Sequence, residues 1–347
     1  MPVAASRSST LLRMSDSDDR GRVRRFRKWF VIAAVVLLVG AGGYGFWQQY
    51  PAAMVGRACG GMLSVDPFLE LSGASRLSLI GSDFEVRKRT VGVPPGVLGQ
   101  NCEVGIAEVV ISRADEQHSG LRYRAYASDD FPVPLEAGWS GFVSEANRFA
   151  SVMVGCRNWG SDEGAGFVVT TRLLSPASVP DPRPKLVRAV IETARSTAEQ
   201  TGCDAWLGED ADLAVPEGTT RSTPAAEASG TCAGMSSVET VRETDAGTAL
   251  IEKCELVGGL ELTAMYGHFE KNYTNGLDVS ASSGADTTYF WTSATCANLL
   301  GGAFYVGERK YGEKPLADAE LADLQRFAQQ SAARYGCNPP EPIDRAR

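Results

Sequence analysis

Two stretches of the sequence, CGGMLSV at residues 59–65 and CAGMSSV at residues 232–238, are near copies of each other. Three further pairs of cysteine motifs follow in the same order: CEV at 102–104 with CEL at 254–256, CRN at 156–158 with CAN at 296–298, and TGC at 201–203 with YGC at 335–337. All eight cysteines belong to this pattern, four in each copy. A repeat of about 150 residues is too long for a solenoid, so we infer a tandem duplication of one small domain.

The charge of the chain is unevenly distributed. Of the 347 residues, 44% are hydrophobic and 22% charged, which is typical of folded protein, and the net charge is −8. Residues 1–28 carry eight basic and three acidic side chains, so the rest of the chain has a net charge of −13. Phosphate binding needs clustered lysine and arginine, and the acidic region after residue 28 argues against it. We therefore expect no nucleic-acid partner.

An apolar segment follows the basic tail. Residues 30–47 read FVIAAVVLLVGAGGYGFW without a charge and with aromatic residues at both ends, as in a short membrane span. The basic residues precede it, so the positive-inside rule predicts a disordered cytoplasmic tail at 1–28, a transmembrane signal anchor at 29–48 and an extracytoplasmic remainder. A cleavable signal peptide would have a shorter apolar core and a small-residue cleavage site, and a lipoprotein would have a cysteine directly after the core.

This topology explains the cysteines. Outside the cytoplasm, an even number in matched positions predicts a disulfide framework. A metal site would need close pairs such as C-x-x-C, but the nearest two cysteines, Cys232 and Cys254, are separated by 21 residues. We therefore expect no metal and no cofactor.

Each copy shows the same order of elements. A short helix follows the first cysteine, strands surround the second and third, and an amphipathic helix ends at Gly202 or Gly336, just before the last cysteine. This predicts an α+β fold of two tandem modules, each an antiparallel-rich sheet with an N-terminal helix, a C-terminal helix and two disulfides. The expected segments are module one at 57–206, a flexible or extended linker at 207–230, module two at 231–338 and a disordered tail at 339–347.

The disulfide pairing is the sharpest structural expectation. Two independent modules leave three pairings for each. A short helix and a return loop between Cys232 and Cys254 would bring these two cysteines together, which favours sequential pairing. The predicted bridges are Cys59–Cys102, Cys156–Cys203, Cys232–Cys254 and Cys296–Cys337. A nested arrangement, with Cys59 bound to Cys203 and Cys102 to Cys156, is the alternative.

The sequence offers few candidates for a functional site. Trp139 and Trp159 lie in glycine-rich polar loops and are the candidate recognition residues. His118 and His268 have different surroundings and lack a partner motif for nucleophilic catalysis, so no catalytic residue is assigned. No polar motif is evident in both copies, which favours display of a surface over catalysis.

The succession of basic tail, single span, C-x-G-[ML] helix, C-E strand, C-x-N strand and helix-Gly-Cys resembles uncharacterised actinobacterial single-pass membrane proteins and lipoproteins with duplicated disulfide-bonded domains. It is also loosely similar to the sensor domains of mycobacterial Ser/Thr kinases. The resemblance implies a cell-surface ectodomain that binds a ligand or partner.

Two functions from different classes remain. The first is a membrane-anchored extracytoplasmic binding or scaffolding protein, whose partner is an envelope protein or peptide. The second is a cell-envelope enzyme that uses a pair of carboxylates for acid and base chemistry. The first is our expectation, and a deep pocket that holds two apposed buried carboxylates would favour the second.

Overall fold

The chain divides into two compact units, Met1–Tyr50 and Pro51–Arg347. The computed structural model describes residues 32–37, 55–73, 85–89, 97–114, 130–146, 148–160, 166–177, 179–270, 283–285, 289–296, 301–309 and 317–343.

In the first unit, residues 32–37 are helical and their side chains are exposed. The remainder of the expected span at 30–47 and the basic tail at 1–28 lie outside the described residues. Within the part of the chain that the structure describes, no helix is long and apolar enough to cross a membrane.

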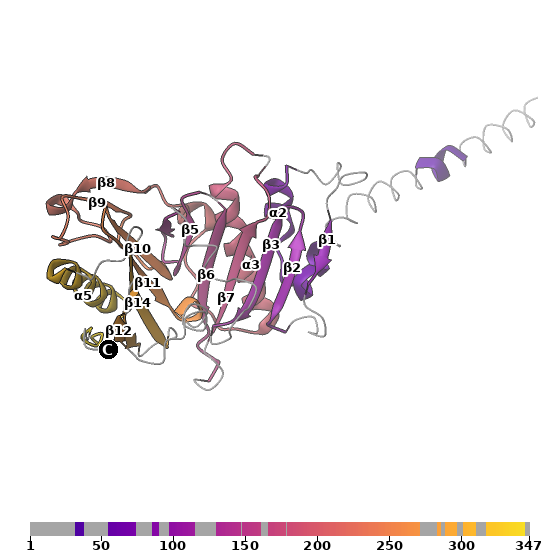
Figure 1. The fold of residues 1–347 in the computed structure, drawn as a ribbon. Helices are drawn as coiled ribbons and strands as arrows, with labels where there is room; N and C mark the ends of the chain where they lie inside the picture. Colours follow the sequence, from indigo (N-terminus) through magenta and orange to yellow (C-terminus); the bar gives the residue numbers. More distant parts are fainter. Residues whose placement is uncertain are drawn as a thin grey trace, which may run out of the picture. The chain divides into compact units, whose positions relative to one another are not determined.

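The second unit contains two antiparallel sheets, each of seven strands among the described residues (Figure 1). The first has the order β1-β2-β3-β7-β6-β5-β4, and the second, read from its other edge, has the order β8-β9-β10-β11-β14-β13-β12. With helices packed on the sheets, this arrangement confirms the α+β class.

The strands of the first sheet are β1 (Val86–Lys88), β2 (Gln100–Val104), β3 (Ala107–Arg113), β4 (Pro132–Pro134), β5 (Gly141–Ser144), β6 (Phe149–Gly155) and β7 (Gly166–Leu173). Those of the second are β8 (Arg221–Pro224), β9 (Thr240–Glu243), β10 (Ile251–Leu256), β11 (Leu260–Tyr266), β12 (Ser283–Ala285), β13 (Tyr289–Thr295) and β14 (Gly302–Arg309). The central strands are rich in β-branched and aromatic residues, which fit a pleated and buried surface.

One long helix covers each sheet. In the first half, α3 (Arg183–Thr201) packs on β6 and β7, and in the second half α5 (Asp318–Arg334) packs on β11 and β14. Apolar residues at helical spacing form the buried faces, as expected from the sequence. Of the positions that helical spacing predicts on these faces, Leu186, Val190, Ala194 and Ala198 in α3 and Leu324, Ala328 and Ala332 in α5 are buried. Leu321, predicted on the same face of α5, is only half-buried.

All four predicted disulfides are present, and no cysteine is free. Cys59, in the 3₁₀ turn η1 (Ala58–Gly61), is bound to Cys102 of β2, and Cys232 is bound to Cys254 of β10. Cys156–Cys203 and Cys296–Cys337 join the end of a strand to the end of a long helix. The sequential scheme is therefore confirmed, and the nested alternative is wrong.

The predicted N-terminal helix exists only in the first half, as α2 (Val65–Leu71). Residues 231–239 form turns and bends and lead directly into β9, so the helix predicted after Cys232 is absent. Buried Asp323 of α5 accepts the backbone N–H groups of Ser236 at 3.0 Å and Ser237 at 2.8 Å. In the first turn of a helix these N–H groups would have no partner within the helix, and here Asp323 accepts them instead.

Residues 207–230, which we expected to be a flexible or extended linker, contain ordered elements. These are η4 (Ala211–Ala214), the edge strand β8 and η5 (Ala225–Glu227). Ala211 and Ala214 are buried in the first core, and β8 pairs with β9. Val215 also packs against the first core, so the polar composition of this segment was misleading.

Part of the predicted disordered tail at 339–347 is ordered. The hydroxyl of Thr292 donates to the carbonyl of Glu341 at 2.6 Å, and the N–H of Glu341 donates to the carbonyl of Ser293 at 3.3 Å. Residues 339–343 therefore lie along β13, whereas 344–347 are outside the described residues.

The two sheets contact each other through an aromatic and cationic cluster. Phe131, fully buried just before β4, has the guanidinium of Arg242 4.5 Å and the ammonium of Lys253 5.1 Å from its ring centroid. Lys253 also donates to the carbonyl of Asp130 at 3.3 Å, and Arg242 forms an ion pair with Glu145 at 3.4 Å. Both cations belong to the second sheet and their partners here to the first half.

Apolar packing continues this contact. The ring of Phe142 in β5 lies 5.7 Å from that of Phe269, which follows β11. Phe142 and Phe149 belong to the hydrophobic cluster of the second sheet although their strands belong to the first. The halves are therefore joined by shared core residues as well as by the chain between them.

We predict that Gly336→Ala lowers the free energy of unfolding by about 1 kcal/mol, because Gly336 has a φ of +66° that an L-residue adopts only with strain. A Cβ at this position would meet nothing within 4 Å, so the cost is confined to the backbone. Urea unfolding of the full chain measures the effect. Gly160→Ala is the matched control, because its Cβ would also meet nothing but its φ lies outside the left-handed region. Equal stability of the two variants would contradict the prediction.

Candidate functional site

Trp139, one of the two candidate recognition residues, is buried, with 1% of its surface exposed. Its indole N–H donates to the carbonyl of Glu209 at 2.9 Å, and the guanidinium of Arg195 lies 5.6 Å from its ring centroid. Gly208 lies so close that a Cβ there would overlap the indole. Trp139 thus anchors residues 208–209 against the first half, and the expectation that it forms a recognition surface is wrong.

Trp159, the other candidate, is half-buried. Its ring lies 6.3 Å from that of Phe167, with the planes inclined by 49°, and it packs against the first hydrophobic core. Its backbone N–H donates to the carbonyl of Cys156 at 3.4 Å.

The most exposed tryptophan among the described residues is Trp206, with 68% of its surface accessible. The next residue in the chain, Leu207, is 40% exposed. The guanidinium of Arg157 lies 5.7 Å from the Trp206 ring centroid and forms an ion pair with Asp204. We call Arg157, Trp206 and Leu207 the Trp206 surface. It combines an aromatic face, an aliphatic side chain and a cation, and tryptophan and arginine are residue types enriched at binding interfaces.

The backbone beneath the Trp206 surface is rigidly held. The Cys156–Cys203 disulfide joins the two segments, and the N–H of Trp206 donates to the carbonyl of Gly155 at 3.2 Å. The side chain of Asn158 donates to the carbonyl of Gly202 and accepts the N–H of Asp204, both at 2.8 Å. Exposed apolar side chains on such a fixed backbone lose little backbone entropy on binding.

Sequence reasoning missed Trp206 because it stood at the predicted boundary of module one, before a polar linker. One signal was available: Trp159 and Trp206 each follow a cysteine of the same disulfide by three residues. Only the pairing of Cys156 with Cys203 brings the two segments side by side, through a β-bridge between Cys156 and Ala205.

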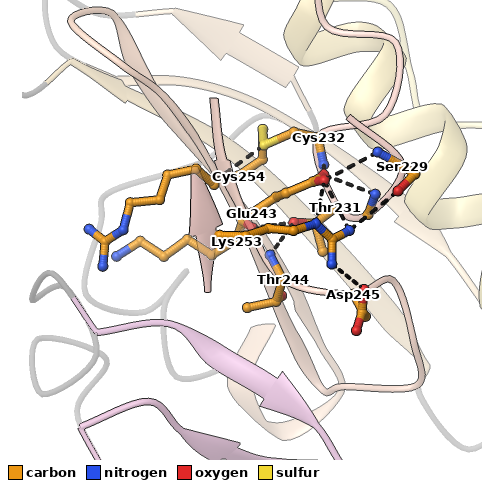
Figure 2. A network of polar contacts seen from close by, with 11 residues as sticks. Ser229, Thr231, Cys232, Glu243, Thr244, Asp245, Lys253 and Cys254 are labelled. Carbon is orange, nitrogen blue, oxygen red and sulfur yellow. Dashed lines mark hydrogen bonds and ion pairs between the residues drawn. A yellow bond between two sulfur atoms is a disulfide. The ribbon is translucent and has the colours of Figure 1, made fainter. Parts of the chain in front are cut away.

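A polar cluster surrounds Glu243 beside the Cys232–Cys254 disulfide (Figure 2). The buried carboxylate of Glu243 accepts the backbone N–H groups of Gly230 at 2.9 Å and Cys232 at 3.0 Å. It also accepts the N–H of Ser229 at 3.2 Å and forms an ion pair with Arg221 at 3.0 Å. With its acceptor sites occupied by the turn that leads into the second half, Glu243 has a structural role.

Cross-strand register reveals a polar feature that is repeated in both halves. Glu103 lies opposite Glu108 in the first sheet, and Glu255 lies opposite Glu261 in the second. Each of these four glutamates has its own cation: Arg89, Arg172, Arg242 and Lys253, respectively. The expectation that no polar motif is repeated is therefore wrong. Because every carboxylate is neutralised by a neighbour, the two pairs are ion-paired sheet positions and lack the features of an acid–base dyad.

Beneath α5, Glu252 forms a buried network. Arg334 contacts its carboxylate at 2.6 Å, and the hydroxyl of Ser331 donates to it at 2.5 Å. Burial raises the pKa of Glu252 above its ordinary value, an effect that Arg334 opposes. Tyr266 contacts Ser331, and burial raises the pKa of this phenol as well, so it stays protonated. Arg334, Ser331 and Tyr335 all bond to the Glu252 carboxylate, so this network attaches α5 to the sheet.

Neither a histidine nor a metal-binding cluster provides a further candidate site among the described residues. His268 is buried and packs edge-on against Phe269 at 5.7 Å, whereas His118 lies outside the described residues. Among the residues that the structure describes, no group of three or more His, Cys, Asp or Glu side chains is placed to hold a metal ion.

No protein family, curated protein or solved structure matches this chain. The geometry of its own residues is therefore the basis for a functional proposal.

We predict that Glu243→Gln lowers the free energy of unfolding by about 1–3 kcal/mol, because the amide NH₂ faces N–H donors and leaves buried groups unsatisfied. Asp245→Asn is the matched control, since Asp245 also pairs with Arg221 but is exposed, and the loss of such a pair costs about 1 kcal/mol or less. Urea unfolding of both variants at neutral pH compares them. A Glu243→Gln variant no less stable than Asp245→Asn would show that the Glu243 cluster does not hold the turn.

Proposed function

We propose that this protein is a membrane-anchored extracytoplasmic binding or scaffolding protein, built from two tandem copies of one module, that engages an envelope protein or peptide. The observation that carries the proposal is the rigidly held, exposed Trp206 surface. Its location outside the cytoplasm is supported by four disulfides and the absence of a free cysteine.

Strand order supports the tandem-copy part of the proposal. Six strands of the first sheet, in the order β1-β2-β3-β7-β6-β5, have counterparts in the order β9-β10-β11-β14-β13-β12 of the second. The second and third cysteines of each half fall at matching places, in or after β2 and β6 and in or after β10 and β13. β4 and β8 are the additions that distinguish the two sheets.

The buried carboxylates favour binding over carboxylate catalysis. Among the described residues, Glu108, Glu243, Glu252, Glu261 and Asp323 are buried. Each is held by a cation, by backbone N–H groups or by both. Catalysis by an acid and a base needs a carboxyl pair open to substrate, and these five are occupied by structural partners.

The anchor is tested by labelling intact cells with a membrane-impermeable maleimide. Native cysteines are all in disulfides, so only an introduced thiol reacts. We expect Ala226→Cys, at an exposed position of η5, to be labelled in intact cells, and Thr10→Cys to be labelled only after permeabilisation. The reverse pattern would contradict the topology, and a mature chain that begins after residue 48 would indicate a cleaved signal peptide.

The binding role is tested by quantitative co-purification of the full-length protein with its envelope partners. We expect Trp206→Ala to weaken the enriched interaction by about 30-fold, the effect of removing a central aromatic anchor. Leu174→Ala is the matched control: Leu174 is 43% exposed and follows β7, at the sheet end opposite to the one that holds Trp206. Partners retained equally by wild type and Trp206→Ala would refute the assignment of this surface.

A further inference from the structure

Exposed apolar side chains are concentrated in one segment of the first half. In the described part of residues 51–347, six large hydrophobic side chains are well exposed, and three of them are Trp206, Leu207 and Leu213. Leu213, in η4, has 58% of its surface accessible. Single exposed apolar residues are common on any protein, but several that gather in one short segment mark a contact surface.

This segment, residues 204–213, runs along α3, and we call it the strip. Asp210 pairs with Arg195 at 3.5 Å, and Asp212 pairs with Arg188 at 2.5 Å. The two arginines are seven residues apart in α3, which corresponds to a rise of about 10 Å. The strip therefore starts at the C-terminal end of α3 and extends toward its N-terminal end, with apolar side chains on both sides of its acidic middle.

The middle of the strip is fixed by its backbone. The N–H of Glu209 donates to the carbonyl of Ala137 at 2.9 Å. The carbonyl of Glu209 accepts the indole N–H of Trp139 at 2.9 Å and the guanidinium of Arg195 at 2.6 Å. The exposed Glu209 side chain thus projects from a backbone that is held on both sides of the peptide unit.

Negative charge is in excess along the strip. Three arginines face five carboxylates in ion pairs: Arg157 with Asp204, Arg195 with Asp210, and Arg188 with Glu70, Glu192 and Asp212. Glu209 adds a further carboxylate, and among the described residues no cation pairs with it. The field of a surface follows the sum of its charges, so a cation is attracted to the strip without the loss of any existing ion pair.

We propose that the partner segment bound by the Trp206 surface is an extended peptide that carries lysine or arginine between apolar residues. This inference rests on the binding role proposed above and specifies the partner. Alternate side chains of an extended peptide share one face. One apolar residue therefore packs on Trp206 and Leu207, and the cation two positions further on faces Glu209. The next apolar residue on the same face packs on Leu213, and an acidic segment is repelled by the excess of carboxylates.

The probe is the peptide acetyl-Leu-Thr-Lys-Thr-Leu-amide, with glutamine or glutamate in place of lysine in two matched peptides. The full chain, labelled with 5-fluorotryptophan in non-ionic detergent micelles, is titrated by ¹⁹F NMR, and Trp206→Phe identifies the Trp206 resonance. We expect the lysine peptide to shift this resonance with a dissociation constant of about 1 mM. The glutamine peptide should bind about two- to fivefold more weakly, and the glutamate peptide should not saturate.

Two variants separate the charge from the apolar contact. Glu209→Gln should weaken the lysine peptide about two- to fivefold and leave the glutamine peptide unchanged, a difference that loss of structure would not produce. Leu213→Ser should weaken both peptides alike, because both contain the same leucines. Glu239→Gln, at an exposed position of the second half, is the matched control for charge and should change neither. Unfolding curves identify any variant that fails to fold.

The inference is overturned if the glutamine or glutamate peptide binds as tightly as the lysine peptide, if Glu209→Gln and Glu239→Gln behave alike, or if no peptide shifts the Trp206 resonance. Glucose that shifts this resonance when the lysine peptide does not would also overturn it, in favour of a carbohydrate partner. Failure of the binding role itself is distinguishable: envelope partners lost with Trp206→Ala but retained by Glu209→Lys would leave that role intact and contradict a basic partner segment.

Discussion

Side-chain alternation along two strands organises much of this protein. In β2 and β10, a cysteine points to the helix-covered face and the next residue, a glutamate, points to the other. The cysteine closes a disulfide beneath that helix layer. The glutamate faces a second glutamate on the neighbouring strand, a like-charge pair that is unfavourable unless cations balance it. The arginines and Lys253 that supply this balance determine what the second face of each sheet can contact.

In the second sheet the same cations also hold the two halves together. Lys253 pairs with Glu261 and reaches the carbonyl of Asp130, while Arg242 pairs with both Glu255 and Glu145. Both cations contact the ring of Phe131. Charge balance within one sheet and attachment to the other therefore use the same side chains. This coupling explains why residues 51–347 behave as one compact unit although they contain two hydrophobic clusters.

The two halves are alike at the point where the chain leaves the last disulfide. After Cys203, the chain bonds to the end of β6 and presents Trp206. After Cys337, the chain bonds to β13. A disulfide at the end of a long helix fixes the direction in which the chain departs, and the residues that follow are free to differ. Equivalent scaffolds can in this way carry different surfaces.

The sequence alone determined the features that depend on local pattern. Matched cysteine motifs identified the disulfides, helical spacing identified the buried faces of α3 and α5, and Gly202 and Gly336 marked the helix ends. The pairing of Cys232 with Cys254 was correct although the reason was not, since a strand rather than a helix returns the chain. Only the tertiary structure decided that Trp139 is buried, that Trp206 is exposed and that residues 207–230 are folded. These outcomes depend on contacts between residues far apart in the chain, such as Asp323 with Ser237 or Trp139 with Glu209, and local propensity carries no information about them.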